Sequence, residues 1–193
     1  GVCISAPLGA TESIKKLNGV EAIWLDHEVE ALKSSNDFVL GDGVSPMLSD
    51  SARLINASSL WALGINGSGI VIAVVDTGIN WNHTSLDDLD DIPATVDPKV
   101  IANVSFVPGV PTGFDDHGHG THVAGIAAGT GGPSHTYMGV APGAQLYAVK
   151  VLDSTGSGQW SWVVAGIEWS IENDADIITM SLGGWGYPYD PVS

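Results

Sequence analysis

The chain has 193 residues, of which 44% are hydrophobic and 25 are glycine, and it carries a formal net charge of −16. This composition is typical of a compact, turn-rich globular protein. The six basic residues form no stripe, so we expect no binding to nucleic acid or to an anionic membrane surface. No apolar run approaches the roughly 20 residues that span a bilayer. The single Cys3 excludes a disulfide framework and a cysteine-based zinc site.

The first residues predict a small β-α-β unit. Val2–Ala6 and Val20–Trp24 have the composition of short strands. Between them, Thr11 is a typical helix cap, and Ile14 and Leu17 have the spacing of an inward-facing helix side. A charged tail, residues 26–32, follows the second strand.

A polar segment rich in Ser, Gly and Asp covers residues 33–54, which is the composition of a linker. From residue 55 the sequence changes from a polar linker composition to apolar runs. Ile70–Val75, Gln145–Leu152 and Asp176–Met180 are apolar, β-branched runs, and Ser161–Asn173 has apolar residues at helical spacing. Strands that alternate with helices predict an α/β fold with a parallel sheet, whose functional loops lie at the carboxyl ends of the strands.

A carboxylate ends the first of these runs, in the pentapeptide Val74–Gly78. Asp76 is well placed there to orient another group, although an aspartate that merely caps the next turn is an equal alternative. D-T-G also opens the catalytic loop of aspartic proteases. Those enzymes bring two such loops together to share one proton, and this sequence has only one.

A histidine-rich segment, residues 115–125, precedes a run of small residues with helical character. His117, His119 and His122 fall within six residues, and one interpretation is the zinc site of a metal-dependent hydrolase. The flanking Gly118 and Gly120 favour another interpretation. They let neighbouring backbone approach His119 closely, as a catalytic imidazole at a crowded helix start requires.

The third segment, Ser181–Gly184, directly follows the last apolar run and is suited to pair with an extended peptide. These three segments, in this order, resemble the subtilisin-like serine proteases, the subtilase family. Gly139–Ile171 is similar to the central segment of that family almost throughout, and the resemblance covers Ile55–Gly184.

The resemblance implies a three-layer α/β sandwich and a serine-type endopeptidase that acts on polypeptides. Asp76 would hold His119 in the correct tautomer, and His119 would be the general base for a serine nucleophile. The resemblance also implies a substrate cleft. One wall would be the primary specificity pocket, formed by Ser181, Leu182 and Gly183. Opposite it would lie Gly156, Ser157 and Gly158, with Trp160 in a more distal apolar pocket.

Ile23–Leu32 resembles the end of a subtilase propeptide, which acts as an intramolecular inhibitor and folding aid. By this resemblance, residues 1–32 are the C-terminal half of a ferredoxin-like α+β propeptide. Residues 33–54 are then the linker and processing region, and residues 55–193 the N-terminal part of the catalytic domain.

Two family motifs are missing from the sequence: the G-T-S-M-A-like segment with the nucleophilic serine and the G-N element with the oxyanion asparagine. We therefore expect a piece of a longer protein that is inert by itself. The alternative is a non-catalytic subtilase-like binding module. A zinc hydrolase that uses His117, His119 and His122 is a weaker alternative.

No cofactor is assigned from the sequence, and calcium stays open. Ser85 stands where many relatives have a calcium-binding aspartate, and residues 130–138 lack the asparagine-rich loop of the family. The acidic run 87–91 could bind a cation, but a solvated loop is the preferred interpretation. Four N-x-S/T sequons, at Asn56, Asn66, Asn82 and Asn103, favour a secreted or cell-surface protein.

Overall fold

A computed structural model describes residues 4–32, 52, 54–90, 92 and 95–184. Its centre is a four-stranded sheet in the order β3-β4-β2-β6, in which every neighbouring pair is parallel. These strands span Val100–Ser105 (β3), Gln145–Lys150 (β4), Val71–Asp76 (β2) and Ile177–Met180 (β6). The parallel sheet predicted from the apolar runs is confirmed, and it gains β3, which the sequence pattern did not indicate.

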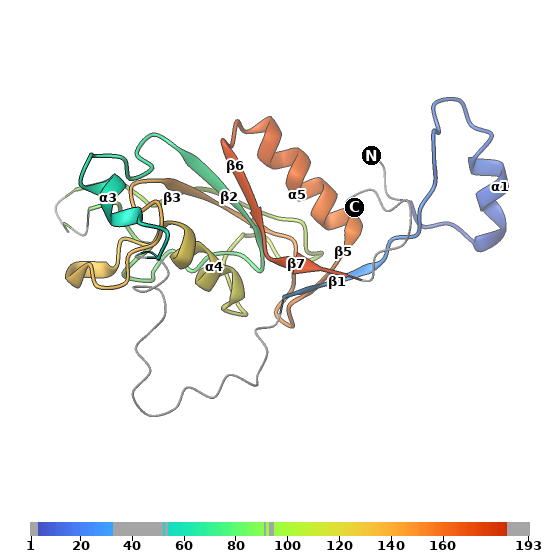
Figure 1. Cartoon of the computed structure of the whole chain (residues 1–193). Helices are drawn as coiled ribbons and strands as arrows, with labels where there is room; N and C mark the ends of the chain where they lie inside the picture. The colour runs from blue at the N-terminus through green and yellow to red at the C-terminus, as the bar shows by residue number, and fades with distance from the viewer. Residues whose placement is uncertain (1–3, 33–51, 53, 91, 93–94, 185–193) are drawn as a thin grey trace.

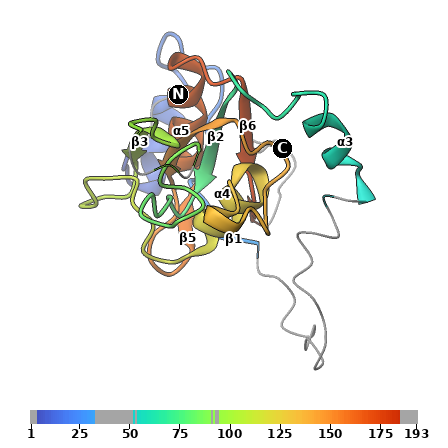
Figure 2. The same cartoon turned by 90° about the vertical axis from the view of Figure 1, so that its left-hand side faces the viewer.

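Two helices, α4 (His119–Ala128) and α5 (Trp160–Glu172), lie on opposite faces of this sheet (Figures 1 and 2). The alternation of side chains in a strand produces this arrangement. Val74 of β2 packs in one core cluster with Ala124 of α4, whereas Val75 packs in the other cluster with Val163 of α5. All four are completely buried, so the predicted three-layer α/β architecture is confirmed.

A second, antiparallel sheet lies at the carboxyl ends of the parallel strands. Its order is β5-β1-β7, and the central strand comes from the N-terminal region (Figure 1). The strands span Glu28–Ala31 (β1), Ser157–Gln159 (β5) and Leu182–Gly183 (β7). The remaining elements are short helices: Leu8–Ala10 (η1), Thr11–Ile14 (α1), Ala57–Trp61 (α3) and Gly132–Ser134 (η2).

The β-α-β prediction for the N-terminal residues is wrong in its two strands. Residues 4–6 and 20–24 are not strands, and α1 ends at Ile14 with Ala10 as its N-cap. Leu17 is 61% exposed instead of facing inward. The physical reason is that a strand needs a neighbour for its backbone hydrogen bonds, and the described residues offer none to these two segments. The linker predicted over 33–54 lies outside the described residues, apart from positions 52 and 54.

No helix among the described residues is both long enough and apolar enough to span a lipid bilayer.

Candidate active site

Asp76 is the last residue of β2 and is completely buried. Its Oδ1 accepts hydrogen bonds from the backbone N–H of Thr77 at 2.7 Å and from the imidazole of His119 at 2.7 Å. Its Oδ2 is buried and accepts no hydrogen bond within the described part of the chain. Burial raises the pKa of the Asp76 carboxyl above its ordinary value, although the hydrogen bonds from His119 and Thr77 oppose this rise.

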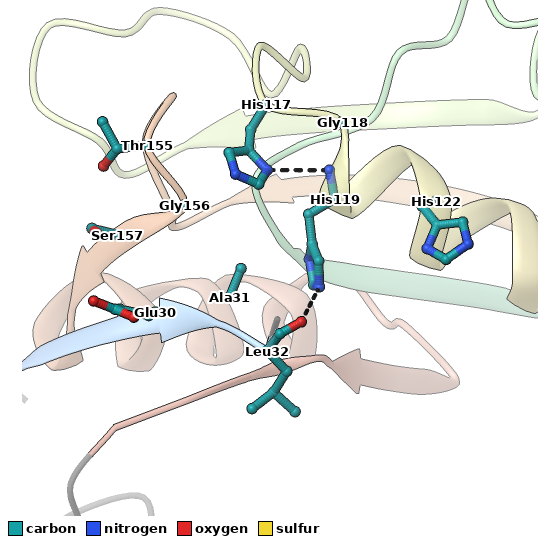
Figure 3. Close-up of a pocket in the computed structure, with 10 residues that line it drawn as sticks. All are labelled: Glu30, Ala31, Leu32, His117, Gly118, His119, His122, Thr155, Gly156 and Ser157. Carbon is teal, nitrogen blue, oxygen red and sulfur yellow. Dashed lines mark hydrogen bonds between the residues drawn. The ribbon is translucent and has the colours of Figure 1, made fainter. Parts of the chain in front are cut away.

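His119 is the first residue of α4, and its two ring nitrogens face different surroundings. Nδ1 meets the buried Asp76, and Nε2 lies 3.1 Å from the carbonyl oxygen of Leu32 (Figure 3). Both partners present an oxygen that accepts hydrogen bonds. The pair that the sequence predicted, Asp76 with His119, is therefore brought into contact.

The backbone at the start of α4 is packed tightly against the end of β2. Gly118 has a φ of 102°, which favours glycine. A Cβ on Gly120 would come within 2.2 Å of the Gly78 carbonyl oxygen. The sequence predicted close approach at both glycines, but it occurs only at Gly120. A Cβ on Gly118 would meet nothing within 4 Å, and this residue supplies the turn instead.

The predicted cleft residues lie on both sides of β1. On one side, Ser157 and Gly158 of β5 pair with Glu30 and Val29, and the carbonyl of Gly156 accepts a hydrogen bond from the N–H of Ala31 at 2.8 Å. On the other side, Gly183 and Leu182 of β7 pair with Glu30 and Ala31, and the carbonyl of Ser181 accepts one from the N–H of Leu32 at 2.9 Å. The two strands thus form the walls of a groove that β1 fills.

The side chains of β1 alternate between the groove and solvent. Val29 is completely buried, Ala31 is 7% exposed, and Glu28 and Glu30 are exposed. Val29 belongs to the same apolar cluster as Trp160, the residue predicted for a distal apolar pocket. The strand therefore seats every second residue in the groove, as an extended peptide does.

A cavity of about 410 Å³ lies beside the last residues of this strand, lined among others by Leu32, His117, His119 and Gly156 (Figure 3). The zinc hypothesis requires three imidazoles to converge, and they do not. Nδ1 of His117 accepts a hydrogen bond from the backbone N–H of His119 at 3.3 Å, while the ring of His119 faces Asp76 and Leu32. No group of three or more His, Cys, Asp or Glu residues in the described ranges is placed to hold a metal ion.

Three buried polar residues around the pair were not singled out from the sequence: Thr77, Asp115 and Lys150. Lys150 is fully buried, and its Nζ donates to the Thr77 carbonyl at 2.6 Å and to Oδ1 of Asp116 at 2.7 Å. Thr77 and Asp115 are hydrogen-bonded to each other at 2.9 Å. An Asp a few residues before a helix start is a capping signal, so Asp115 was accessible to sequence reasoning. The lysine in an apolar strand carried no such signal.

Residues 67–190 match the subtilase family. Subtilisin E from Bacillus subtilis is 47% identical over 131 residues, which are 67% of this chain and 31% of that protein. The thermostable alkaline protease of Halalkalibacterium halodurans is 40% identical over 158 residues, covering 82% of this chain and 39% of the relative. The minor extracellular protease Vpr of Bacillus subtilis is 34% identical over 196 residues, covering 95% of this chain and 23% of that protein.

The chain thus spans about a third of the length of the curated relatives it matches. The family match extends over more than half of its residues, and it overlaps most of the region, Ile55–Gly184, in which the sequence resemblance was found. The chain belongs to the subtilase family.

Proposed function

We propose that this chain belongs to a subtilisin-type serine endopeptidase precursor and carries the general base and its orienting carboxylate. The observation that carries the proposal is the 2.7 Å contact between buried Asp76 and His119, at the edge of a groove that holds an extended strand. A binding module with the same fold would need the groove but has no evident need for the ion pair.

In the proposed mechanism, Asp76 keeps the proton of His119 on Nδ1, which leaves Nε2 free to act as base. His119 takes the proton of a serine hydroxyl as its oxygen attacks the peptide carbonyl, and it returns this proton to the leaving amine. Water then hydrolyses the acyl-enzyme with the same base. The family resemblance places the serine and the oxyanion asparagine in motifs that residues 1–193 lack. Without the nucleophile, kcat of such a triad falls by about 10⁶-fold.

The groove residues are the proposed substrate-binding residues, and polypeptides are the proposed substrates. Gly156, Ser157 and Gly158 would bind one edge of an extended peptide, and Ser181, Leu182 and Gly183 the other. This support comes from the backbone pairing with β1, which recognises any extended main chain. Because the buried positions of β1 are apolar or small, we infer a preference set by size and apolarity instead of charge.

Residues 1–32 are proposed as the inhibitory propeptide of the same chain. Residues 28–32 lie in the groove, and the carbonyl of Leu32 meets the base at 3.1 Å. Asp26 adds a second anchor, because its carboxylate accepts hydrogen bonds from the N–H and the hydroxyl of Ser161 in the first turn of α5, at 2.8 and 2.5 Å. A strand seated in this way excludes other peptides, and the bond after Leu32 is the one presented for processing.

We also infer that the protein is secreted or held at the cell surface. Four N-x-S/T sequons support this inference. One relative is named an extracellular protease.

The first experiment is to read the coding DNA beyond the codon for Ser193. A frame that continues through a G-N element to a G-T-S-x-A motif agrees with the endopeptidase. A residue other than Ser at that position refutes it and leaves the non-catalytic module.

The second experiment expresses the complete reading frame as wild type, His119→Ala and, as a control, His83→Ala, an exposed histidine in a loop. We expect wild type and the control to lose the N-terminal segment and to yield a new N-terminus after Leu32. His119→Ala should keep the segment attached. Equal processing in all three proteins would refute the role of His119.

A further inference from the structure

We propose that Asp115 is a positioning residue for catalysis: its carboxylate fixes the first turn of α4 and thereby places the His119 imidazole against Asp76. The inference rests on the proposed function of the Asp76–His119 pair and names a third residue on which that pair depends. Its carboxylate hydrogen-bonds to neither Asp76 nor the His119 ring, so it acts on the geometry of the pair through the backbone and hydroxyl groups that it holds. Burial raises the pKa of Asp76, and the negative charge of Asp115 adds to this rise.

Asp115 is 7% exposed, and its carboxylate is surrounded by donors. Its Oδ1 accepts hydrogen bonds from the Thr77 hydroxyl and from the backbone N–H groups of His117 and Gly118, each at 2.9 Å. Its Oδ2 accepts from the backbone N–H of Thr121 at 2.9 Å and from the hydroxyl of the same residue at 2.5 Å. Five donors therefore converge on one side chain.

These contacts complete the N-terminus of the helix that begins with His119. The first N–H groups of a helix have no partner inside it and must be satisfied from outside. The N–H of His119 donates to Nδ1 of His117, and that of Gly120 donates to the Thr77 hydroxyl at 2.8 Å. The N–H of Thr121 donates to Asp115. Asp115 therefore caps the third position directly and the second through Thr77.

Thr77 connects this cap to the strand that carries Asp76. Its backbone N–H donates to Asp76 at 2.7 Å, and its hydroxyl lies between Asp115 and Gly120. Thr121, the other residue whose hydroxyl donates to Asp115, accepts a hydrogen bond from the N–H of Asn80 at this hydroxyl, at 2.9 Å. The end of β2 and the start of α4 are thus joined on both sides of Asp115.

An anion suits this position better than an amide. Because every neighbour donates, an asparagine would turn its amide nitrogen toward at least one backbone N–H. Burial works against the charged carboxylate. The hydrogen bonds from Gly118, Thr121 and His117 outweigh it and hold the pKa of Asp115 below its ordinary value. The negative charge also lies at a helix N-terminus, where it is favoured.

The test compares Asp115→Asn with wild type in the protein expressed from its complete reading frame. The matched control is Asp90→Asn. Asp90 is an exposed loop carboxylate that also accepts from a backbone N–H and a threonine hydroxyl, Ile92 and Thr95 at 2.9 Å each. We expect D115N to lower kcat by about 10²-fold, with KM changed by less than about twofold, because the base is displaced while the groove is kept. D90N should leave both constants unchanged.

A spectroscopic readout separates positioning from general damage to the fold. In wild type, the proton between His119 Nδ1 and Asp76 should give a strongly deshielded ¹H resonance. In D115N this resonance should move or disappear, while circular dichroism stays that of the wild type. If kcat and the resonance are both unchanged in folded D115N, the proposal is overturned. A wild-type protein that keeps the resonance but hydrolyses nothing would instead refute the proposed function, and the resonance alone would then decide the role of Asp115.

A second pair of variants covers the case in which D115N does not fold. Thr77→Val removes the hydroxyl between Asp115 and the N–H of Gly120 without changing any charge. Thr77→Ser restores that hydroxyl. We expect T77V to reduce kcat and T77S to recover most of the loss. Equal kcat in T77V and wild type would overturn the link between the cap and the base.

Discussion

Adding one methyl group at Gly120 should displace His119, the proposed catalytic base. A Cβ at this position would lie 2.2 Å from the Gly78 carbonyl oxygen and 3.1 Å from the Gly78 nitrogen. Carbon and carbonyl oxygen normally meet no closer than about 3.3 Å, so the helix start and the strand end must separate by about 1 Å. The Thr77 hydroxyl would also lie at 3.1 Å, but the nearest obstructing atom belongs to the backbone, so the movement of a side chain cannot make room.

The expected magnitude has two parts. Overpacking of this kind costs about 1–3 kcal/mol, and each kcal/mol lowers Tm by about 2–4 °C in a domain of 150–250 residues and by less in a longer one. A shift of about 1 Å in a catalytic group costs about 10²-fold in rate. Gly120→Ala in the full-length protein should therefore melt at a lower temperature and lose most of its kcat.

Gly125, on the same helix, is the matched control, because a Cβ there would meet nothing within 4 Å. Gly125→Ala should gain about 0.5–1 kcal/mol from its better helix propensity and keep its activity. Thermal unfolding and steady-state kinetics measure both variants. If G120A were stabilised as G125A is, with normal kcat, the steric argument would be refuted.

Three other substitutions test the charges and apolar contacts of the same region. Because burial raises the pKa of Asp76, the ionised carboxylate costs stability at neutral pH. Asp76→Asn should raise the urea midpoint at about pH 7 while abolishing hydrolysis, and a lower midpoint would contradict this. The pKa of Asp115 is shifted in the opposite direction. Its pKa is lowered from 3.8, so the stability it contributes is complete above that value and disappears as the pH falls through the folded-state pKa. The difference in unfolding free energy between wild type and D115N should shrink as the pH falls below about 5, and a constant difference would refute the assignment. Finally, Val29 is fully buried in the groove, so Val29→Asp in a synthetic peptide of residues 26–32 should weaken inhibition of the processed enzyme by at least about tenfold. Glu28→Gln, at an exposed position, should change it little, and equal inhibition by both peptides would contradict the seating of β1.

The parallel sheet was predictable because buried strands and amphipathic helices leave a direct pattern in the sequence. Ile70–Val75 became β2 with a one-residue shift, and Ser161–Asn173 became α5, which begins at Trp160. Within that helix the buried face was less clear. Ile171 is 64% exposed, while Val163 is completely buried. Aromatic and branched residues occur on both sides of α5, so periodicity alone did not fix its rotation.

The small antiparallel sheet was the least predictable part. β5 and β7 have three and two residues, too few for a pattern of alternation to be recognised. Both pair with β1, which is more than 120 residues away in sequence from β5. Contacts over such a separation depend on the tertiary fold, and here only the family resemblance pointed to them.

Hydrogen bonding distinguishes the two buried carboxylates of the candidate site, which are Asp76, the proposed orienting group, and Asp115. Asp76 and Asp115 are 0% and 7% exposed, so burial disfavours the charge of both. Asp115 meets five donors, and its pKa is lowered. Asp76 meets two donors on one oxygen and none of the described residues on the other, and its pKa is raised.

A carboxylate whose charge is fully compensated by backbone and hydroxyl donors gains little from a further positive charge nearby. An undercompensated one gains more, because a proton on the adjacent imidazole supplies what its surroundings lack. Asp76 is the undercompensated carboxylate, and it is the one in contact with His119. In the proposed mechanism, the imidazolium that forms when His119 accepts a proton is therefore stabilised by Asp76, the carboxylate with fewer donors. The saturated Asp115 meanwhile keeps the helix start, and with it the ring, in place.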